Sequence, residues 1–364
     1  MRGDQIGRKA TERVGEGFKF IDLFAGMGGF HMALEGLGAE CVFASEKDPY
    51  ARATYEKTFS ESDVVKNKDR CFNIDLTEVT RLDIREKGGH RQSTQLQKRL
   101  KKQIGSAIEP FHLLCAGFPC QPFSQAGKKK GFGDARGNLF FDIERILRVH
   151  EPDAIFLENV RNLLVHDNMN TITVIRRRLR KAGYGKVWTP VVWASEHGLP
   201  QHRPRVFIIG FRDREAHLYF EKNMPKPREL FNQRNPNHAP LKYDMSRIFG
   251  GEVTMGPSAD VRKRRDIGFT LRVGGRMSPI EARQNWDCYM VNGKETRLQP
   301  VHGLMMQGFT DSCESGEDWF PEIVNDVQAM KLLGNSVAVP AIRDYARVIF
   351  DALRHARSAR NLGA

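Results

Sequence analysis

The sequence lacks long hydrophobic runs and paired cysteines. No apolar stretch in the 364 residues approaches the length of a membrane span, and the polar residues 1–17 have no apolar core, so an integral membrane protein and a secretory signal are both disfavoured. The six cysteines are scattered without a CxxC pair, so neither a zinc site nor a disulfide framework is indicated. We expect a cytoplasmic protein with reduced thiols, no bound metal and a flexible lead-in over residues 1–17.

Internal repeats and low-complexity segments are also lacking, but positive charge is abundant. Lys and Arg number 57 against 44 Asp and Glu, a formal net charge of +13. Such an excess predicts a polyanionic partner, with nucleic acid as the first candidate. The alternative is a basic enzyme that has no such partner.

Short apolar runs alternate with amphipathic segments through the first two-thirds of the chain. The pattern predicts strands near 18–26, 40–46, 111–119, 153–160 and 205–211, and helices near 30–38, 138–150 and 170–183. Strands alternating with helices indicate an α/β fold with a doubly wound, mostly parallel sheet.

The composition and the hydrophobic pattern of the sequence change near residue 211. Between residues 211 and 300 there are 17 Lys and Arg against 11 Asp and Glu, with frequent proline and asparagine and weak apolar periodicity. Helical patterns resume afterwards. We therefore expect a smaller, irregular domain over 213–318, inserted into a larger domain formed by 18–212 and 319–364. A second basic run, 83–108, is interpreted as a solvated helix face, with contact to nucleic-acid phosphates as the alternative.

The stretch DLFAGMGGF, residues 22–30, follows a predicted strand and opens a helix. Gly26, Gly28 and Gly29 allow a tight turn and a close approach of a cofactor. Glu46 ends the next strand, where a carboxylate commonly binds ribose hydroxyls, and Asp75 is a plausible contact to an adenine. Because the spacing is not GxGxxG, a methyl donor is favoured over a nicotinamide or a flavin, and a turn without any ligand remains possible.

Three further stretches place reactive groups at strand ends. Cys120, in AGFPCQPFS, is a candidate nucleophile, although an isolated cysteine is more often a small buried hydrophobe. Glu158, in FLENV, is a candidate proton donor if burial raises its pKa. Arg203 and Arg205, in QHRPRVFIIG, alternate on one strand face and could orient a ring or form a structural ion-pair network.

Together these motifs resemble one enzyme family. FIDLFAGMGGF, GFPCQPFS, ENV, QHRPRVFIIG and LLGNSVAVPAI occur in this order, and the sequence looks like a DNA cytosine-C5 methyltransferase of the compact prokaryotic type, from Phe20 to about Ile342. The resemblance implies an S-adenosylmethionine-dependent methyltransferase fold, Rossmann-like, and a cytosine flipped out of double-stranded DNA. It also implies the product S-adenosylhomocysteine.

The resemblance also implies roles for individual residues. Cys120 would add to C6 of cytosine, and Glu158 would protonate or hydrogen-bond N3. Arg203 would hold the ring oxygen and help to orient Glu158, while Arg205 would support Cys120. Flanking the nucleophile, Pro119 and Gln121 would shape the pocket.

Cofactor and DNA contacts carry over in the same way. The implied cofactor-binding residues are Phe24, Gly26, Gly28, Gly29, Glu46, Lys47, Asp75, Leu76, Asn335, Ser336 and Val337. The implied DNA-binding residues are Ser124, Arg136, Thr270, Arg272 and Arg276, with 213–318 as the target-recognition domain. Lys47, Thr310 and Cys313 depart from the residues that are usual in the family. The compact length is typical of restriction–modification enzymes, which implies a separate cognate endonuclease, and we expect a monomer.

Three alternatives remain open at this point. A tRNA cytosine-C5 methyltransferase would share Cys120 and Glu158. A DNA-binding relative without catalysis would share the fold, but the intact Cys120, Glu158 and Arg203 argue against it. A nicotinamide-dependent oxidoreductase would need a different glycine spacing in the turn.

Overall fold

A central eight-stranded sheet organises the protein in the computed structural model. The structure describes residues 13–81, 93–118, 139–225, 241, 244–254, 266–274, 276–280, 282, 284–311 and 318–362. The strands of the main sheet are β1 (Lys19–Leu23), β2 (Glu40–Ser45), β3 (Phe72–Asn73), β4 (Leu113–Gly117), β5 (Ala154–Val160), β6 (Val187–Trp188), β7 (Val191–Trp193) and β8 (Pro204–Phe211).

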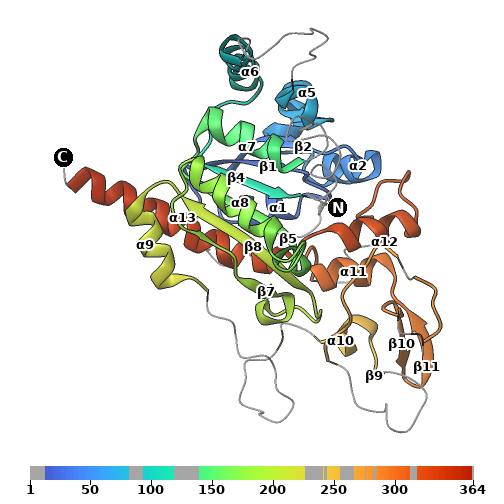
Figure 1. Ribbon diagram of the computed structural model, residues 1–364. Coiled ribbons are helices and arrows are strands. Elements are labelled where there is room, and N and C mark those ends of the chain that lie inside the picture. The colour runs from blue at the N-terminus through green and yellow to red at the C-terminus, as the bar shows by residue number, and fades with distance from the viewer. Residues whose placement is uncertain are drawn as a thin grey trace.

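The sheet is parallel across its first five strands and antiparallel at one end. Its order is β3-β2-β1-β4-β5-β8-β6, with β7 also paired to β8 (Figure 1). Strands β1 to β5 pair in parallel, whereas β8 runs antiparallel to β5. The chain order reverses direction between β1 and β4, and ligands of such sheets bind beside the carboxyl ends at this point. The predicted mostly parallel, doubly wound sheet is confirmed.

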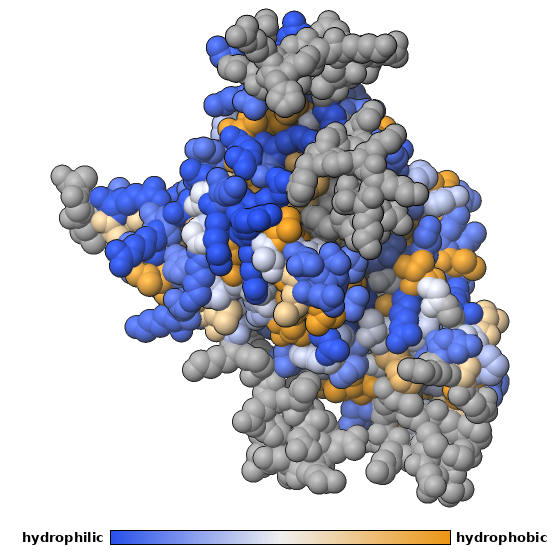
Figure 2. Space-filling view, viewed as in Figure 1, coloured by the Kyte–Doolittle hydropathy of each residue, from blue (hydrophilic) through white to orange (hydrophobic). Residues whose placement is uncertain are grey.

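Helices cover both faces of this sheet. On one face, α1 (Gly29–Glu35) and α13 (Val339–Leu362) join a core cluster that includes Phe156. On the other face, α7 (Leu139–His150) and α8 (Asn170–Lys181) join a second cluster that includes Ile155 and Leu157 (Figure 1). Successive residues of β5 therefore point to opposite cores, as strand geometry requires. The solvent side of α7 and α8 is mainly hydrophilic in Figure 2.

The basic region contains more regular structure than its sequence suggests. A separate antiparallel sheet, in the order β11-β10-β9, is formed by β9 (Val253–Thr254), β10 (Cys288–Val291) and β11 (Lys294–Arg297). Strands of two to four residues are too short to give a clear periodic signal, which is why the sequence predicted an irregular region. Helix α10 (Met245–Phe249) contacts β9 and α11 (Pro300–Gln307), and α12 (Asp326–Asn335) contacts α11, whereas α9 (Arg214–Asn223) packs against α13.

Further short helices lie in the connections between strands of the main sheet. They are α2 (Pro49–Thr58), α3 (Asp63–Lys66), α4 (Lys68–Cys71), α5 (Leu76–Thr80) and two 3₁₀ turns, Arg161–Leu164 and Ala194–His197. Within the described part of the chain, no helix is both long and apolar enough to span a membrane.

The end of the expected lead-in is held against the last helix. The guanidinium of Arg354 donates to the backbone oxygens of Arg13, Val14 and Glu16 at 3.0–3.2 Å. Gly15 N also donates to Leu37 O at 2.8 Å. Residues 13–17 are therefore part of the folded body, and residues 1–12 lie outside the described residues.

Candidate active site

The glycine-rich turn lies between β1 and α1, at the carboxyl edge of the sheet. Phe24, Gly26 and Gly28 alternate in the left-handed region, with φ of 56°, 56° and 82°. A Cβ on Gly28 would lie 2.1 Å from the Phe59 ring, so packing excludes any side chain there. A Cβ on Gly26 would have no heavy atom within 4 Å among the described residues. The turn is therefore closed on its core side and has open space beside Gly26.

Glu46 fixes the next strand end to this turn. Its Oε2 accepts from Gly26 N and its Oε1 from Asp48 N, both at 2.7 Å. Burial raises the pKa of this carboxyl, although backbone hydrogen bonds from Asp48 and Gly26 oppose that shift. Glu46 thus lies beside the open space at Gly26, where the sequence predicted a ribose contact.

Asp75 and Lys47 form an ion pair on the same edge. Lys47 Nζ lies 2.7 Å from Asp75 Oδ2, and this contact lowers the pKa of Asp75. Asp75 Oδ1 caps α5 by accepting from Thr77 N at 3.0 Å and from Thr77 Oγ1 at 2.8 Å. Sequence reasoning selected both residues but missed the pair and the cap. Leu76, next in the chain, is buried in the core at the first position of α5.

The C-terminal GNSV segment packs directly against the glycine-rich turn. A Cβ on Gly29 would lie 2.4 Å from Val337 Cγ2 and 3.5 Å from Ser336 Oγ. Val337 and Ser336 are buried, and Asn335 is exposed at the end of α12. The sequence-based expectation that this segment returns to the turn therefore agrees with the packing.

Gly29→Ala should destabilise the fold through this contact. The added methyl overlaps Val337, and an overpacked core position typically costs about 1–3 kcal/mol. The matched control is Gly185→Ala, because a Cβ on Gly185 meets no described atom within 4 Å. Urea unfolding of both variants measures the difference. Equal stability of the two would show that Gly29 is not restricted by Val337.

Glu158 lies at the carboxyl end of β5 and pairs with Arg205. The Arg205 Nε to Glu158 Oε1 distance is 2.8 Å, and both side chains are largely buried. Because β8 is antiparallel to β5, its first residues lie beside the last residues of β5, with Val160 opposite Arg205. Burial raises the pKa of Glu158, and this outweighs the lowering by Arg205 and then by Arg203. A buried carboxyl of raised pKa is suited to donate a proton.

Arg203 has a different environment from the one expected. Its guanidinium is buried and donates to Leu271 O at 3.1 Å, to Gly334 O at 3.0 Å and to Ser336 O. The contact to Glu158 that the sequence assigned to Arg203 is made by Arg205, which corrects that assignment. Arg203, just before β8, instead connects this part of the chain to the backbone carbonyls of residue 271 and of residues 334 and 336. Burial is also the main reason that its pKa is lowered.

Asn159 holds the chain that leads to Cys120, a role that sequence reasoning missed. Its side-chain amide, buried, donates to Phe118 O at 2.8 Å. Gly117 lies opposite Glu158 in the β4–β5 register, and a Cβ on Gly117 would lie 3.8 Å from Glu158 Oε2. The expected residues Pro119, Cys120, Gln121, Ser124 and Arg136 lie outside the described residues.

The Thr-Leu segment of the basic region lies beside the two arginines. His202 N donates to Gly268 O at 2.9 Å, and Thr270 Oγ1 donates to His202 O. Arg272 is exposed. Arg276 Nη1 donates to Asp326 O at 3.3 Å, and its Nε lies 3.8 Å from Asp287 Oδ2. Of the two arginines expected to contact DNA here, Arg272 is the more exposed.

Comparison with known proteins identifies this arrangement. A family model described as C-5 cytosine-specific DNA methylase matches residues 18–251. The chain belongs to this family. The type II methyltransferase M.HaeII of Haemophilus aegyptius is 35% identical over 345 residues, covering 93% of this chain and 95% of that protein. M.HhaI of Haemophilus parahaemolyticus is 33% identical over 353 residues, covering 90% and 92%.

Solved structures agree on the fold of this methylase. A mutant of Spodoptera frugiperda DNMT2 aligns with a TM-score of 0.56 and 20% identity, over 92% of this chain and 99% of that one. The S. pombe Dnmt2 methyltransferase aligns with the same score at 18% identity, over 92% of this chain and 99% of that one. At this identity the likeness concerns the fold alone. The sequence relatives, which are type II methyltransferases, favour a DNA cytosine-5 methyltransferase over the RNA enzyme and the oxidoreductase.

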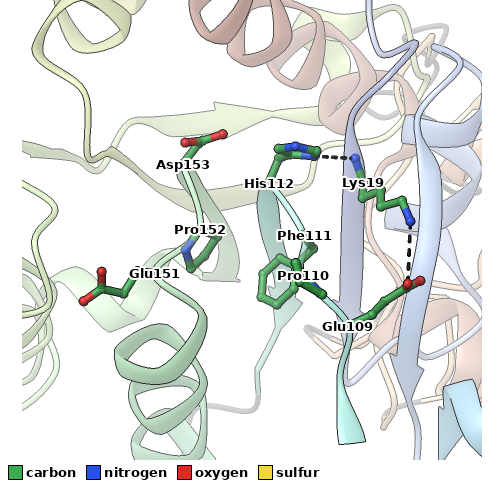
Figure 3. A pocket seen from close by; sticks show the side chains of 8 residues that line it. All are labelled: Lys19, Glu109, Pro110, Phe111, His112, Glu151, Pro152 and Asp153. Atoms are coloured by element: carbon green, nitrogen blue, oxygen red, sulfur yellow. Dashed lines mark hydrogen bonds and ion pairs between the residues drawn. The ribbon is translucent and has the colours of Figure 1, made fainter. Parts of the chain in front are cut away.

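The methylase also has a surface pocket away from these residues. It has a volume of about 510 Å³ and is lined by Lys19, Glu109, Pro110, Phe111, His112, Glu151, Pro152 and Asp153. Figure 3 shows Lys19, His112 and Asp153 at the amino ends of neighbouring strands, whereas Glu158 is at the carboxyl end of β5. The pocket therefore lies at the edge of the sheet opposite the candidate active site.

Proposed function

We propose that this methylase transfers a methyl group from S-adenosylmethionine to C5 of a flipped-out cytosine within a short, specific sequence of duplex DNA. The observation that carries the proposal is the buried Glu158–Arg205 pair at the carboxyl end of β5. This pair places an acid at the carboxyl edge of the main sheet, where the glycine-rich turn also lies. Asn159, beside it, anchors the strand end two residues before Cys120.

In the proposed chemistry, the Cys120 thiolate adds to C6 of cytosine and forms an S–C6 bond. The displaced electron pair moves toward N3, where Glu158 donates its proton, and C5 becomes nucleophilic. Arg205 orients Glu158 and lies on the side of the pocket that would receive the ring oxygen of cytosine. Once C5 is methylated, N3 returns its proton to Glu158 and a water molecule takes the C5 proton. The electron pair of that C–H bond re-forms the C5–C6 double bond while the S–C6 bond breaks and releases Cys120. S-adenosylmethionine, when bound, supplies the electrophilic methyl group.

The residues at the carboxyl edge fit that cofactor. The open space at Gly26 leaves room beside the backbone, and the Glu46 carboxylate next to it suits ribose hydroxyls. Phe24, Gly28, Gly29 and Val337 would frame the site. Asp75 would meet the adenine amino group only if Lys47 shares or releases its Oδ2.

The setting of the reaction follows from the relatives. We propose that residues 213–318 recognise the DNA target, with Thr270, Arg272 and Arg276 near it and Ser124 and Arg136 on the active-site loop. The relatives named type II methyltransferases suggest a role in a restriction–modification system beside a cognate endonuclease. We also propose that the methylase acts as a monomer on DNA in a prokaryotic cytoplasm.

Methyl transfer from labelled S-adenosylmethionine to unmethylated plasmid DNA tests the proposal directly. We expect label in DNA, and bisulfite sequencing should show protected cytosines in one short recurring context. Transfer RNA serves as the competing substrate in a parallel reaction. Label in RNA but not in DNA, or no label despite cofactor binding, would contradict the proposed reaction.

A further inference from the structure

Helix α6 (Ser93–Ala107) presents a strip of unpaired positive charge. Lys98, Lys101 and Lys102 are exposed and follow the i, i+3, i+4 spacing of one helix face, and exposed Arg99 flanks them. Within the described residues, none of these four cations forms an ion pair with an acid. Three lysines on one face without neutralising partners give a local positive potential facing solvent.

The opposite side of α6 anchors it firmly. Ile104 and Ile108 are buried in the core cluster shared with α7, and Leu100 packs against the same cluster. Gln103 Nε2 lies 2.7 Å from Glu78 O and 3.0 Å from Val79 O, at the end of α5. The lysine strip is therefore held in a fixed position by α5 and α7.

The position of the strip separates it from the recognition region. Gly105, near the end of α6, lies beside Val149 near the end of α7, and the three lysines occupy the middle of α6. In Figure 1, α6 lies at one end of the molecule and β9, β10 and β11 lie at the other. A ligand that contacts both must extend across the protein.

We propose that the α6 strip binds backbone phosphates of duplex DNA outside the target sequence. The proposal rests on the proposed function, because the DNA substrate supplies the polyanion that complements the strip. Each lysine meeting a phosphate releases condensed counterions, so this contact adds sequence-independent affinity that falls with salt. Since the strip lies far from the recognition region, it engages only duplexes that extend well beyond the target.

The test compares two triple variants in DNA-binding titrations over a range of salt concentrations. The first is Lys98→Gln/Lys101→Gln/Lys102→Gln. The matched control, Arg177→Gln/Arg180→Gln/Lys181→Gln, removes the same charge from exposed positions of α8. The probes are duplexes of about 60 and about 15 base pairs, the longer one being about 200 Å and the shorter about 50 Å in length.

We expect the α6 variant to bind the long duplex at least about 10-fold more weakly, with a salt slope reduced by up to about 2.7, or 0.9 for each phosphate. The short duplex and the α8 control should behave as wild type. A Lys98→Arg/Lys101→Arg/Lys102→Arg variant should restore binding, because it keeps the charge. Equal losses in the α6 and α8 variants, or wild-type binding by the α6 variant, would overturn the proposal.

Methyl transfer separates this result from the proposed function. An α6 variant that methylates the short duplex at the wild-type rate but binds the long one normally refutes the α6 contact and leaves the reaction intact. If the wild type methylates no DNA at all, the proposed reaction fails, while the binding titrations still report on α6.

Discussion

Replacing Cys120 with alanine should reduce methyl transfer by at least about a thousandfold, because the variant lacks the thiolate that forms the bond to C6. C5 of cytosine is a poor nucleophile while the ring remains aromatic, so the loss should appear in turnover and not in substrate affinity. Initial rates with labelled S-adenosylmethionine, at saturating DNA, measure this effect.

The control for this variant is DNA binding. The substitution removes none of the cations that contact DNA phosphates, so the dissociation constant for target DNA should stay within about threefold of wild type. Wild-type enzyme should also form a covalent complex with DNA that contains 5-fluorocytosine, and Cys120→Ala should not. Retained turnover in this variant would refute the assignment of the nucleophile.

Glu158→Gln should lower turnover by about 10²- to 10⁴-fold, the usual contribution of a positioned acid. Glutamine keeps the size of the side chain but cannot give a proton to N3, and it loses the ion pair with Arg205. Affinity for S-adenosylmethionine should change little, because Glu46 and Gly26 are the groups at the proposed cofactor position. A large loss of cofactor binding would show that Glu158 acts elsewhere.

The pH dependence provides a second test of Glu158. Burial raises the pKa of this group, so its acid form persists to higher pH than that of an ordinary glutamate. The step that needs this proton should therefore slow as the pH rises through the raised value, and Glu158→Gln should lack this limb of the kcat/KM profile. The same shift means that neutral Glu158 contributes stability fully below the unfolded pKa, and that this contribution is lost as pH rises through the folded pKa.

Melting temperatures across pH check that second effect. The difference between wild type and Glu158→Gln should move against the wild type as the pH increases through this range, because only the wild type must then bury a charge. Arg205 limits the size of the change, since its guanidinium stabilises the ionised form. A difference independent of pH would mean that the pKa of Glu158 is the same in the folded and the unfolded protein, which would contradict the raised pKa.

The sequence alone determined the parallel half of the fold and the chemical groups of the site. Local periodicity predicts strands such as β1 and β5, and the glycines at 26, 28 and 29 predict a tight turn after β1. The residue types at Cys120 and Glu158, in their motifs, indicate a nucleophile and an acid. These are local properties, so they can be read without knowing which distant segments meet.

Only the tertiary structure decided which of two similar arginines meets Glu158. Arg203 and Arg205 have the same chemistry, but the antiparallel course of β8 brings Arg205 to the end of β5. Arg203 is drawn instead to the carbonyls of Leu271 and Gly334, residues 68 and 131 positions away in the chain. The pair of Lys47 with Asp75 and the small β9–β11 sheet likewise depend on contacts between separated segments. Periodicity within one segment carries no information on such contacts, because the partner is chosen by packing and not by the local sequence.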